Sequence, residues 1–368
     1  MPDVIVIGAG AIGAACAWRL AQAGAKVTIL ERAAPASGAS RAALGVLQHH
    51  VEPGQPLAYQ HLALRGGELF PSLLEELNAA TGLPRAHHAE GQLSFALAEA
   101  ELPALQATLA ANVERGVAVE RLSAAECLKL EPGINPAVLG GIFFPNNAWI
   151  DNTALTLAFA RAAQSAGARL ERAEAGAVLS QGGRVIGVRA GREVYEAEWV
   201  VLAAGCWSGE LRGVPALPVR PVRGQALAVA GQLVQRIVAA AHGYLVPKDG
   251  GQTLVGATVE EAGFDASLTV GGLAEIMAAG AQIAPGLARC QYLTAWAGLR
   301  PGTPDGWPYL GPFAALPQLI AATGHFRNGI LQAPATAEIV SALVMGQDLP
   351  VDISALSPDR HGHEGGEA

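Results

Sequence analysis

Cysteine is scarce in this chain and has no regular spacing. The 368 residues include four cysteines, Cys16, Cys127, Cys206 and Cys290, none in a CxxC pair or a metal-ligand pattern. A disulfide framework or a zinc site would need closer, paired cysteines. We therefore expect small buried thiols, no bound metal, and a cytoplasmic location in which thiols stay reduced.

Basic residues are also in deficit. The chain has 24 Lys and Arg against 32 Asp and Glu, a formal net charge of −8. Nucleic acids and anionic membranes both bind basic surfaces, so the balance disfavours either as a partner. A local positive pocket for a small anion remains compatible with this charge.

Long apolar runs without a helix breaker are missing too. The longest uncharged run, residues 306–326, contains Pro308, Pro312 and Pro317, which would interrupt a membrane-spanning helix. The first ten residues lack the basic region of a signal peptide, so we expect neither a leader nor a transmembrane segment. At 368 residues the chain is long enough for two domains, or for one large domain interrupted by insertions, and 51% hydrophobic residues can supply a sizeable core.

The first 32 residues carry the clearest pattern that is present. A buried, β-branched run at 4–7 leads into Gly-Ala-Gly-Ala-Ile-Gly at 8–13, and apolar residues at helical spacing follow. A second buried run at 27–30 ends on Glu31. Strand, glycine turn, helix, strand and acid occur in the order that a dinucleotide site requires.

Each part of this pattern has its own physical role. Gly8 permits a tight turn, Gly10 lets the backbone approach a pyrophosphate, and Gly13 lets the helix pack on the sheet. The N-terminus of the helix presents free N–H groups and a partial positive charge to the phosphates. Glu31 can accept hydrogen bonds from the ribose hydroxyls. The stretch therefore predicts an α/β, Rossmann-like nucleotide-binding unit.

Alternating polar and apolar residues separated by turn sequences in the rest of the chain predict a second, antiparallel domain inserted into the first. We expect a long helix over 56–81 and a C-terminal helix from about Pro334 to Met345. The predicted nucleotide-binding segments are 1–83, 147–217 and 296–356, the second domain comprises 84–146 and 218–295, and residues 357–368 form a polar, glycine-rich, disordered tail.

Two later stretches each set an arginine between apolar segments. Arg300 lies in Trp-Ala-Gly-Leu-Arg-Pro-Gly-Thr at 296–303, and Arg327 in Gly-His-Phe-Arg-Asn-Gly-Ile at 324–330. A guanidinium in apolar surroundings is costly unless it meets an anion. The anion could be a ligand, or each arginine could pair with a structural carboxylate or a backbone carbonyl. Spacing alone leaves both interpretations open.

Taken together, these motifs resemble the FAD-dependent D-amino-acid oxidase superfamily, and within it the glycine oxidases of the thiamine pathway. The likeness spans residues 3–345, and the GLRPGT and HFRNG stretches make it specific. The motifs are residues 8–13 with Glu31, 201–208 (VLAAGCWS), 244–247 (YLVP), 256–258 (GAT), 296–303 and 324–330.

The resemblance implies FAD rather than NAD, in a domain of the glutathione-reductase type. No cysteine follows the GLRP stretch, so the FAD is expected to be non-covalent. The positions that match the family's cofactor contacts are Gly8, Gly10, Ala11, Ile12, Gly13, Glu31, Arg32, Ser40, Leu44, Gly45, Val46, Gly176, Ala204, Gly205, Trp207, His325, Phe326, Arg327, Asn328, Gly329, Ile330 and Leu331.

The resemblance also implies a substrate site in the antiparallel domain. Tyr244 and Arg300 match the residues that hold the substrate carboxylate, and Arg327 matches one on the substrate side of the flavin. His242 and Val259 fall at pocket positions. Val259 stands where the thiamine-pathway enzyme has a methionine, and Gln48-His49-His50 replaces a stretch of small residues. Both departures leave the exact amine open.

The implied reaction is oxidative deamination of glycine, sarcosine or small D-amino acids. Hydride passes from Cα to flavin N5, the imine is hydrolysed to a 2-oxo acid such as glyoxylate with ammonia or an amine, and molecular oxygen becomes hydrogen peroxide. One alternative is a dehydrogenase that passes electrons to a quinone or partner protein. Another is a flavin-binding structural or sensor protein without turnover. A homo-oligomer stays open.

Overall fold

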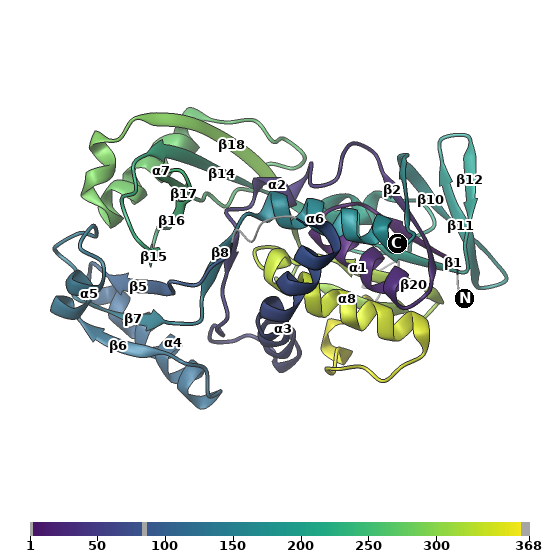
Figure 1. The fold of residues 1–368 in the computed structure, drawn as a ribbon, viewed down its shortest axis with the longest axis horizontal. Helices are drawn as coiled ribbons and strands as arrows, with labels where there is room; N and C mark the ends of the chain where they lie inside the picture. Colours follow the sequence, from purple (N-terminus) through teal and green to yellow (C-terminus); the bar gives the residue numbers. More distant parts are fainter. Residues whose placement is uncertain (1–2, 83–86, 362–368) are drawn as a thin grey trace, which may run out of the picture.

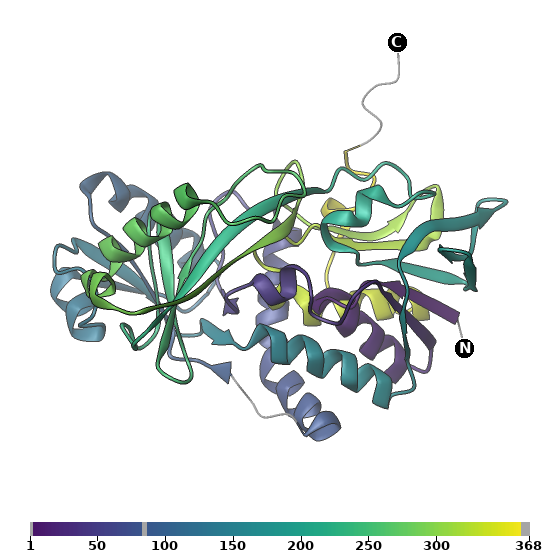
Figure 2. The same cartoon turned by 90° about the horizontal axis from the view of Figure 1, so that it is seen from above.

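The computed structural model describes residues 3–82 and 87–361, which build two large sheets side by side (Figures 1 and 2). The first is six-stranded, in the order β19 (Tyr309–Phe313), β20 (Leu316–Thr323), β13 (Trp199–Leu202), β1 (Asp3–Ile7), β2 (Lys26–Glu31) and β9 (Arg169–Arg172). The second is eight-stranded, in the order β18 (Tyr292–Gly302), β14 (Arg220–Ala230), β17 (Gln252–Gly256), β16 (Gly243–Lys248), β15 (Ile237–Ala240), β5 (Gln92–Ala96), β7 (Gly140–Phe144) and β6 (Glu120–Ser123).

Two small sheets and eight α-helices complete the described part of the chain. The sheets are β10 (Ala175–Gln181), β11 (Arg184–Ala190) and β12 (Glu193–Glu196), and β3 (Val46–Leu47), β8 (Ala148–Ile150) and β4 (His87–His88). The helices are α1 (Ala11–Gln22), α2 (Ala39–Ala42), α3 (Leu57–Thr81), α4 (Leu102–Glu114), α5 (Ala124–Leu130), α6 (Asn152–Ser165), α7 (Val270–Ile283) and α8 (Gly329–Met345).

The six-stranded sheet is parallel around β1, as the opening sequence predicts. β1 pairs in parallel with β2 and β13, and both of its faces are buried. Val4 and Val6 pack with α1, α6 and α8 on one face, whereas Ile5 and Ile7 pack with the core around Tyr309 on the other. Burial on both faces explains why the strand is continuously hydrophobic rather than alternating.

In the eight-stranded sheet, residues that face the core alternate with residues that face a cavity, because the two faces of the sheet have different surroundings. Leu93, Val238 and Leu245 face a hydrophobic core that includes residues of α7. Ser94, Ala239 and Tyr244 lie side by side in register on the opposite face. Successive strand residues point to opposite faces, so this row stays clear of the core. That row lines the larger cavity described below.

Several predictions of elements can be checked directly. The long helix is α3, as expected, but α8 begins at Gly329, five residues before the predicted start, and carries Pro334 inside it. Residues 357–361 are ordered rather than part of a disordered tail, because Arg360 pairs with Asp305; residues 362–368 lie outside the described part. The boundary predicted after residue 295 falls inside β18. The assignment of segments to domains stays a prediction.

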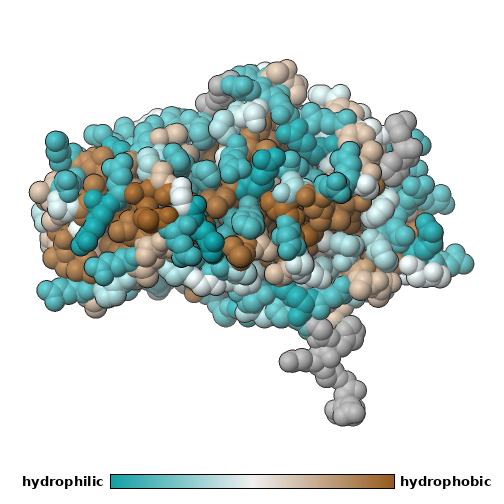
Figure 3. All heavy atoms as spheres, turned by 90° about the horizontal axis from the view of Figure 1, so that it is seen from below, coloured by the Kyte–Doolittle hydropathy of each residue, from teal (hydrophilic) through white to brown (hydrophobic). Residues whose placement is uncertain are grey.

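The expectations from composition concern cysteines, membrane-spanning helices and metal ligands. Three of the four free cysteines are buried and Cys290 is half-buried. No helix between residues 3–82 or 87–361 is long and apolar enough to cross a membrane, and no group of three metal-ligating side chains lies together in these ranges. The face shown in Figure 3 carries brown apolar areas interrupted by hydrophilic residues.

Candidate active site

The glycine turn between β1 and α1 is shaped for close backbone approach. Gly8 has φ +103°, and a Cβ there would clash with the carbonyl oxygen of Ala203. A Cβ at Gly13 would clash with the carbonyl of Gly8, which explains the tight packing of α1 on the turn. At Gly10 the nearest atom to such a Cβ is the Ser40 hydroxyl at 3.1 Å. The turn is therefore closed against the protein and open toward the first cavity.

Glu31 joins the end of β2 to the same turn. Its carboxylate accepts hydrogen bonds from the backbone N–H groups of Ala9 at 2.8 Å and Ala33 at 2.9 Å. The guanidinium of Arg32 stacks 3.8 Å from the ring centre of Trp207. Both side chains border one end of a cavity of about 330 Å³, where a carboxylate suits ribose hydroxyls and flat side chains suit an adenine ring.

Most positions predicted to contact the cofactor border this first cavity. They are Gly8, Gly10, Ala11, Ile12, Glu31, Arg32, Ser40, Gly176, Ala204, Gly205, Trp207, His325, Phe326, Arg327, Gly329 and Ile330. Leu44, Gly45, Val46 and Asn328 border the second cavity instead. Gly13 and Leu331 border neither, because Gly13 packs under the turn and Leu331 packs against Gly66 of α3. Their individual roles stay predictions.

The second cavity, of about 900 Å³, lies on the polar face of the eight-stranded sheet. Its lining includes all five predicted substrate residues: Tyr244, Arg300, Arg327, His242 and Val259. The two cavities share lining residues, among them Leu299, Phe326 and Arg327. A long ligand bound in the first can therefore extend its far end into the second.

Arg300 points into this cavity without a carboxylate partner. Its Nη1 donates to the backbone carbonyl oxygens of Thr258 at 3.0 Å and Arg223 at 3.4 Å, and no ion pair in the described ranges includes it. The guanidinium packs on Gly224, where a Cβ would clash with it. Burial lowers the pKa of Arg300, and neighbouring Arg327 also lowers it. The negative charge of an anionic ligand would oppose both effects by favouring the charged form of Arg300.

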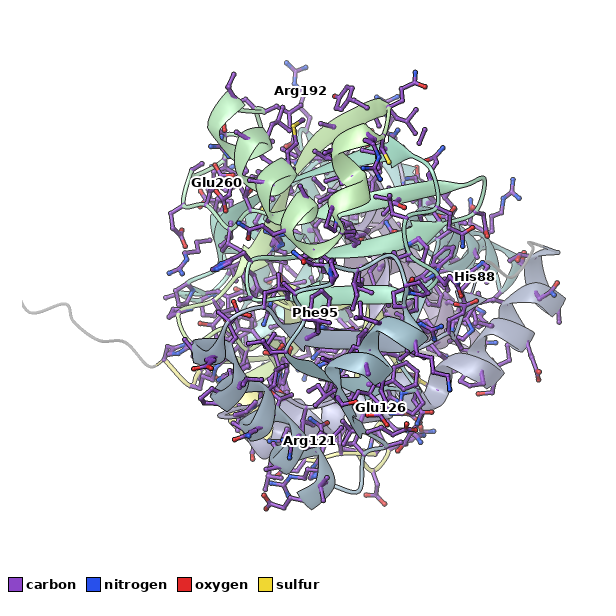
Figure 4. The ribbon with its side chains drawn as sticks, turned by 90° about the vertical axis from the view of Figure 1, so that its left-hand side faces the viewer. His88, Phe95, Arg121, Glu126, Arg192 and Glu260 are labelled. Carbon is purple, nitrogen blue, oxygen red and sulfur yellow. The ribbon has the colours of Figure 1, made fainter. Side chains whose placement is uncertain are left out.

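The strand segment beneath Arg300 is fixed by a charged network that the sequence did not indicate. Arg223 is buried and donates to Glu260 at 2.6 Å and Asp265 at 2.9 Å. Glu260, labelled in Figure 4, also accepts from Thr258 and Gln225. Burial alone would raise the pKa of Glu260, but these hydrogen bonds lower it below its usual value. The only sequence signal was an acid just after the GAT motif.

Tyr244 offers a hydroxyl donor beside Arg300. It lies on β16, paired with Gly256 of β17, and a glycine there leaves room for the phenol ring. Burial raises the pKa of Tyr244, although the positive charges of Arg300 and Arg327 oppose the rise. The phenol therefore stays protonated at neutral pH and can donate to the same anion as Arg300.

Arg327 does have a carboxylate partner. Its Nη2 lies 3.0 Å from an oxygen of Glu52, and its side chain is 53% exposed. Of the two alternatives left open for this arginine, the structure therefore shows pairing with a carboxylate of the protein itself. The sequence analysis did not identify Glu52 as that partner. His242 is exposed, and Val259 is 62% exposed, so both border the mouth of the cavity rather than its depth.

Comparison with known proteins gives consistent matches over nearly the whole chain. The profile of the DAO family, described as FAD dependent oxidoreductase, matches residues 3–343. The chain is 35% identical to the glycine oxidase of Geobacillus kaustophilus over 98% of this chain and 97% of that protein. The crystal structure of glycine oxidase from the same organism superposes with a TM-score of 0.93, 33% identity, and coverage of 98% and 100%. An iminodiacetate oxidase from Chelativorans sp. BNC1 superposes with a TM-score of 0.88 and 27% identity, covering 96% and 98%.

Proposed function

The chain belongs to the DAO family of FAD dependent oxidoreductases, and we propose that within it the protein oxidises glycine and other small amino acids or amines, such as sarcosine and small D-amino acids. Its cofactor is FAD. The observation that carries the choice of substrate class is Arg300, a half-buried guanidinium at the second cavity without a carboxylate partner in the described chain.

The residues of the first cavity fit FAD. Gly10 leaves the turn open to a pyrophosphate, the N-terminus of α1 faces it, and Glu31 borders the end where a ribose would lie. Phe326 and Arg327 line both cavities, which supports a binding mode in which the other end of the FAD would lie on the Arg300 side. When bound, FAD would accept the two electrons of the Cα–H bond. The absence of any cysteine after Arg300 supports non-covalent binding.

Arg300 and Tyr244 orient the substrate. Arg300 can give two parallel hydrogen bonds to a carboxylate, and the Tyr244 hydroxyl can give a third. Fixing the carboxylate fixes the direction of the Cα–H bond, which is the main task the protein has in this reaction. Because His242 is exposed at the mouth, it is not placed as a general base. An amine that binds in its neutral form needs none.

The products follow from the chemistry of an oxidised amine. Loss of hydride from Cα and of a proton from the nitrogen leaves an imine, which water converts to a 2-oxo acid with release of ammonia or a primary amine. The two electrons and two protons reduce oxygen to hydrogen peroxide. The names of the relatives support an oxidase and do not favour the quinone-linked dehydrogenase. A part in thiamine synthesis and a cytoplasmic location stay predictions.

The test is a substrate panel on the purified, FAD-loaded protein. Glycine, sarcosine, D-alanine, D-proline and simple amines are assayed for peroxide production, with dye reduction under argon in parallel. We expect peroxide with small amino acids and little turnover of amines that lack a carboxylate. Dye reduction without oxygen consumption would instead indicate the dehydrogenase. Failure of every compound to bleach the flavin would support a protein without turnover.

A further inference from the structure

The wall of the larger cavity opposite Arg300 is polar. Ser94 lies two strands from Tyr244, through Ala239 of β15, so their backbones are about 10 Å apart at roughly 4.8 Å per strand. Gln92 and His50 border the same wall. Glycine is shorter than the roughly 10 Å between the Tyr244 and Ser94 backbones. The cavity therefore contains a polar region that the proposed smallest substrate does not use.

A chain of hydrogen bonds fixes the orientation of these side chains. The Asn147 side-chain nitrogen lies 2.8 Å from Nδ1 of His50 and 3.1 Å from Oε1 of Gln92. The Gln92 nitrogen donates to the Ser94 hydroxyl oxygen at 3.0 Å. His50 also stacks on Phe144, with ring centres 4.1 Å apart. Asn147, Gln92 and His50 are all buried, so the arrangement is held by packing.

This arrangement leaves two donors for the cavity. In the structure the Asn147 amide nitrogen faces Nδ1 of His50, and the Asn147 Oδ1 is buried without a hydrogen-bond partner. In this orientation Nδ1 of His50 accepts and the proton of the neutral ring sits on Nε2. Burial lowers the pKa of His50 to about 4, so the ring is neutral at physiological pH. The Ser94 oxygen already accepts from Gln92, which leaves its O–H to donate. No described residue accepts a hydrogen bond from either group.

We propose that this donor pair, His50 Nε2–H and Ser94 O–H, binds a second carboxylate or carbonyl group of the substrate. The preferred substrates are then amino acids with an acceptor-bearing arm on the nitrogen or on Cα. This inference rests on the proposed function and names the substrate class of the same site. Glu52, the acid on this side of the cavity, is paired with Arg327 at 3.0 Å, so it repels an incoming carboxylate less.

The test compares substrates of matched shape with and without the acceptor. Iminodiacetate against N-isobutylglycine reports an arm on nitrogen, and D-asparagine against D-leucine reports an arm on Cα. The ratio of kcat/KM within each pair is measured for wild type, His50→Leu and Ser94→Ala, all loaded with FAD. His88→Leu is the matched control. His88, labelled in Figure 4, also stacks on an aromatic ring, with its ring centre 4.0 Å from that of Trp149, but it borders neither cavity.

We expect the ratio for at least one pair to fall about tenfold in His50→Leu and in Ser94→Ala, the loss typical of one hydrogen bond to an acceptor. His50→Gln, which keeps an N–H, should recover part of the loss, and His88→Leu should leave both ratios unchanged. If His50→Leu does not fold, Ser94→Ala gives the same comparison. Glycine turnover with both ratios unchanged would overturn this inference alone. No reduction of the flavin by glycine would overturn the proposed function as well.

Discussion

Arg300, which we propose binds the substrate carboxylate, is held in place without being neutralised. Its Nη1 donates to the backbone carbonyl oxygens of Thr258 and Arg223. The side chains of these same two residues donate to the carboxylate of Glu260, so hydrogen bonds link Glu260 to Arg300 through these two residues. The dipoles of the carbonyls position the guanidinium while its charge remains available. A direct Glu260–Arg300 pair would instead compete with the substrate carboxylate.

At the same scale, His325 predicts a pH dependence of stability. Burial lowers the pKa of His325 to about 3, and its Nε2 lies 3.0 Å from the Thr336 hydroxyl. In the unfolded chain its pKa is about 6.5. Between these values the unfolded state binds one more proton, so its contribution to stability is complete above pH 6.5 and is lost as the pH falls toward 3.

His325→Gln keeps a partner for Thr336 but cannot titrate in this range. Between pH 4.5 and 6, the unfolding free energy of the FAD-loaded wild type should fall by about 1.4 kcal/mol per pH unit more than that of the variant. Urea unfolding at a fixed excess of FAD measures both slopes. Equal slopes would mean that His325 does not lose its proton on folding.

At the scale of elements, the pairing of β14 with β18 builds the proposed substrate side of the site. Gly224 opposes Gly298 in this pair, and Val222 opposes Arg300, which leaves a flat surface on which the guanidinium lies. A glycine in a strand interior usually weakens the strand, and here it marks a close approach by a side chain. Arg300 therefore depends on a residue in the neighbouring strand that has no polar side chain.

Gly224→Ala tests this dependence. The added Cβ would clash with the Arg300 guanidinium, and Gly224 has no left-handed φ that would add strain. A displaced guanidinium should reduce kcat/KM for glycine about 10²-fold, because a shift near 1 Å costs that much in a positioned site. FAD affinity should stay close to wild type. Gly271→Ala on α7, where a Cβ meets open space, is the control; equal activities of the two variants would contradict the account.

Local elements were predictable where local chemistry decides them. The turn at 8–13 and the strands around it follow from glycine and β-branched residues a few positions apart. Pro334 suggested a helix start, because proline favours the first turn. In the structure it is buried inside α8, which packs against α1 and α3, so tertiary packing outweighs the missing N–H.

The parts of the site that sequence could not predict join distant residues. Glu52 and Arg327 are 275 positions apart, and His50 and Asn147 are 97 apart. No periodicity or spacing rule connects such pairs, because they meet only after the two sheets are placed side by side. Arg300 and Tyr244 were found because they lie in motifs that carry the family resemblance. Their supports, Arg223 and Glu260, lie outside those motifs.

At the scale of the whole molecule, the end of the described chain packs against the half that contains the six-stranded sheet. Arg360 makes two hydrogen bonds to Asp305, at 2.8 and 2.9 Å, and stacks 3.9 Å from the ring centre of Tyr309. It also donates to the carbonyl oxygens of Trp307 and Pro308. This turn therefore ties the C-terminal segment to the loop after β18, and neither Arg360 nor Asp305 borders a cavity.

Arg360→Ala should accordingly change stability and leave catalysis intact. Removing one partner of a partly buried, bidentate pair should lower the unfolding free energy by about 2 kcal/mol. Urea unfolding measures the loss, and the kcat/KM for glycine should remain within twofold of wild type. A variant as stable as wild type would show that the turn is not held by this pair.

The central claim is that Arg300 binds the substrate carboxylate beside the FAD. The most direct test is anaerobic reduction of the bound flavin by glycine in Arg300→Ala, with Arg289→Ala, an exposed arginine outside both cavities, as control. We predict a yellow, FAD-loaded variant in which reduction is slower by about 10² to 10³-fold at low glycine, and a control at wild-type rate. Reduction of Arg300→Ala at the wild-type rate would contradict the account.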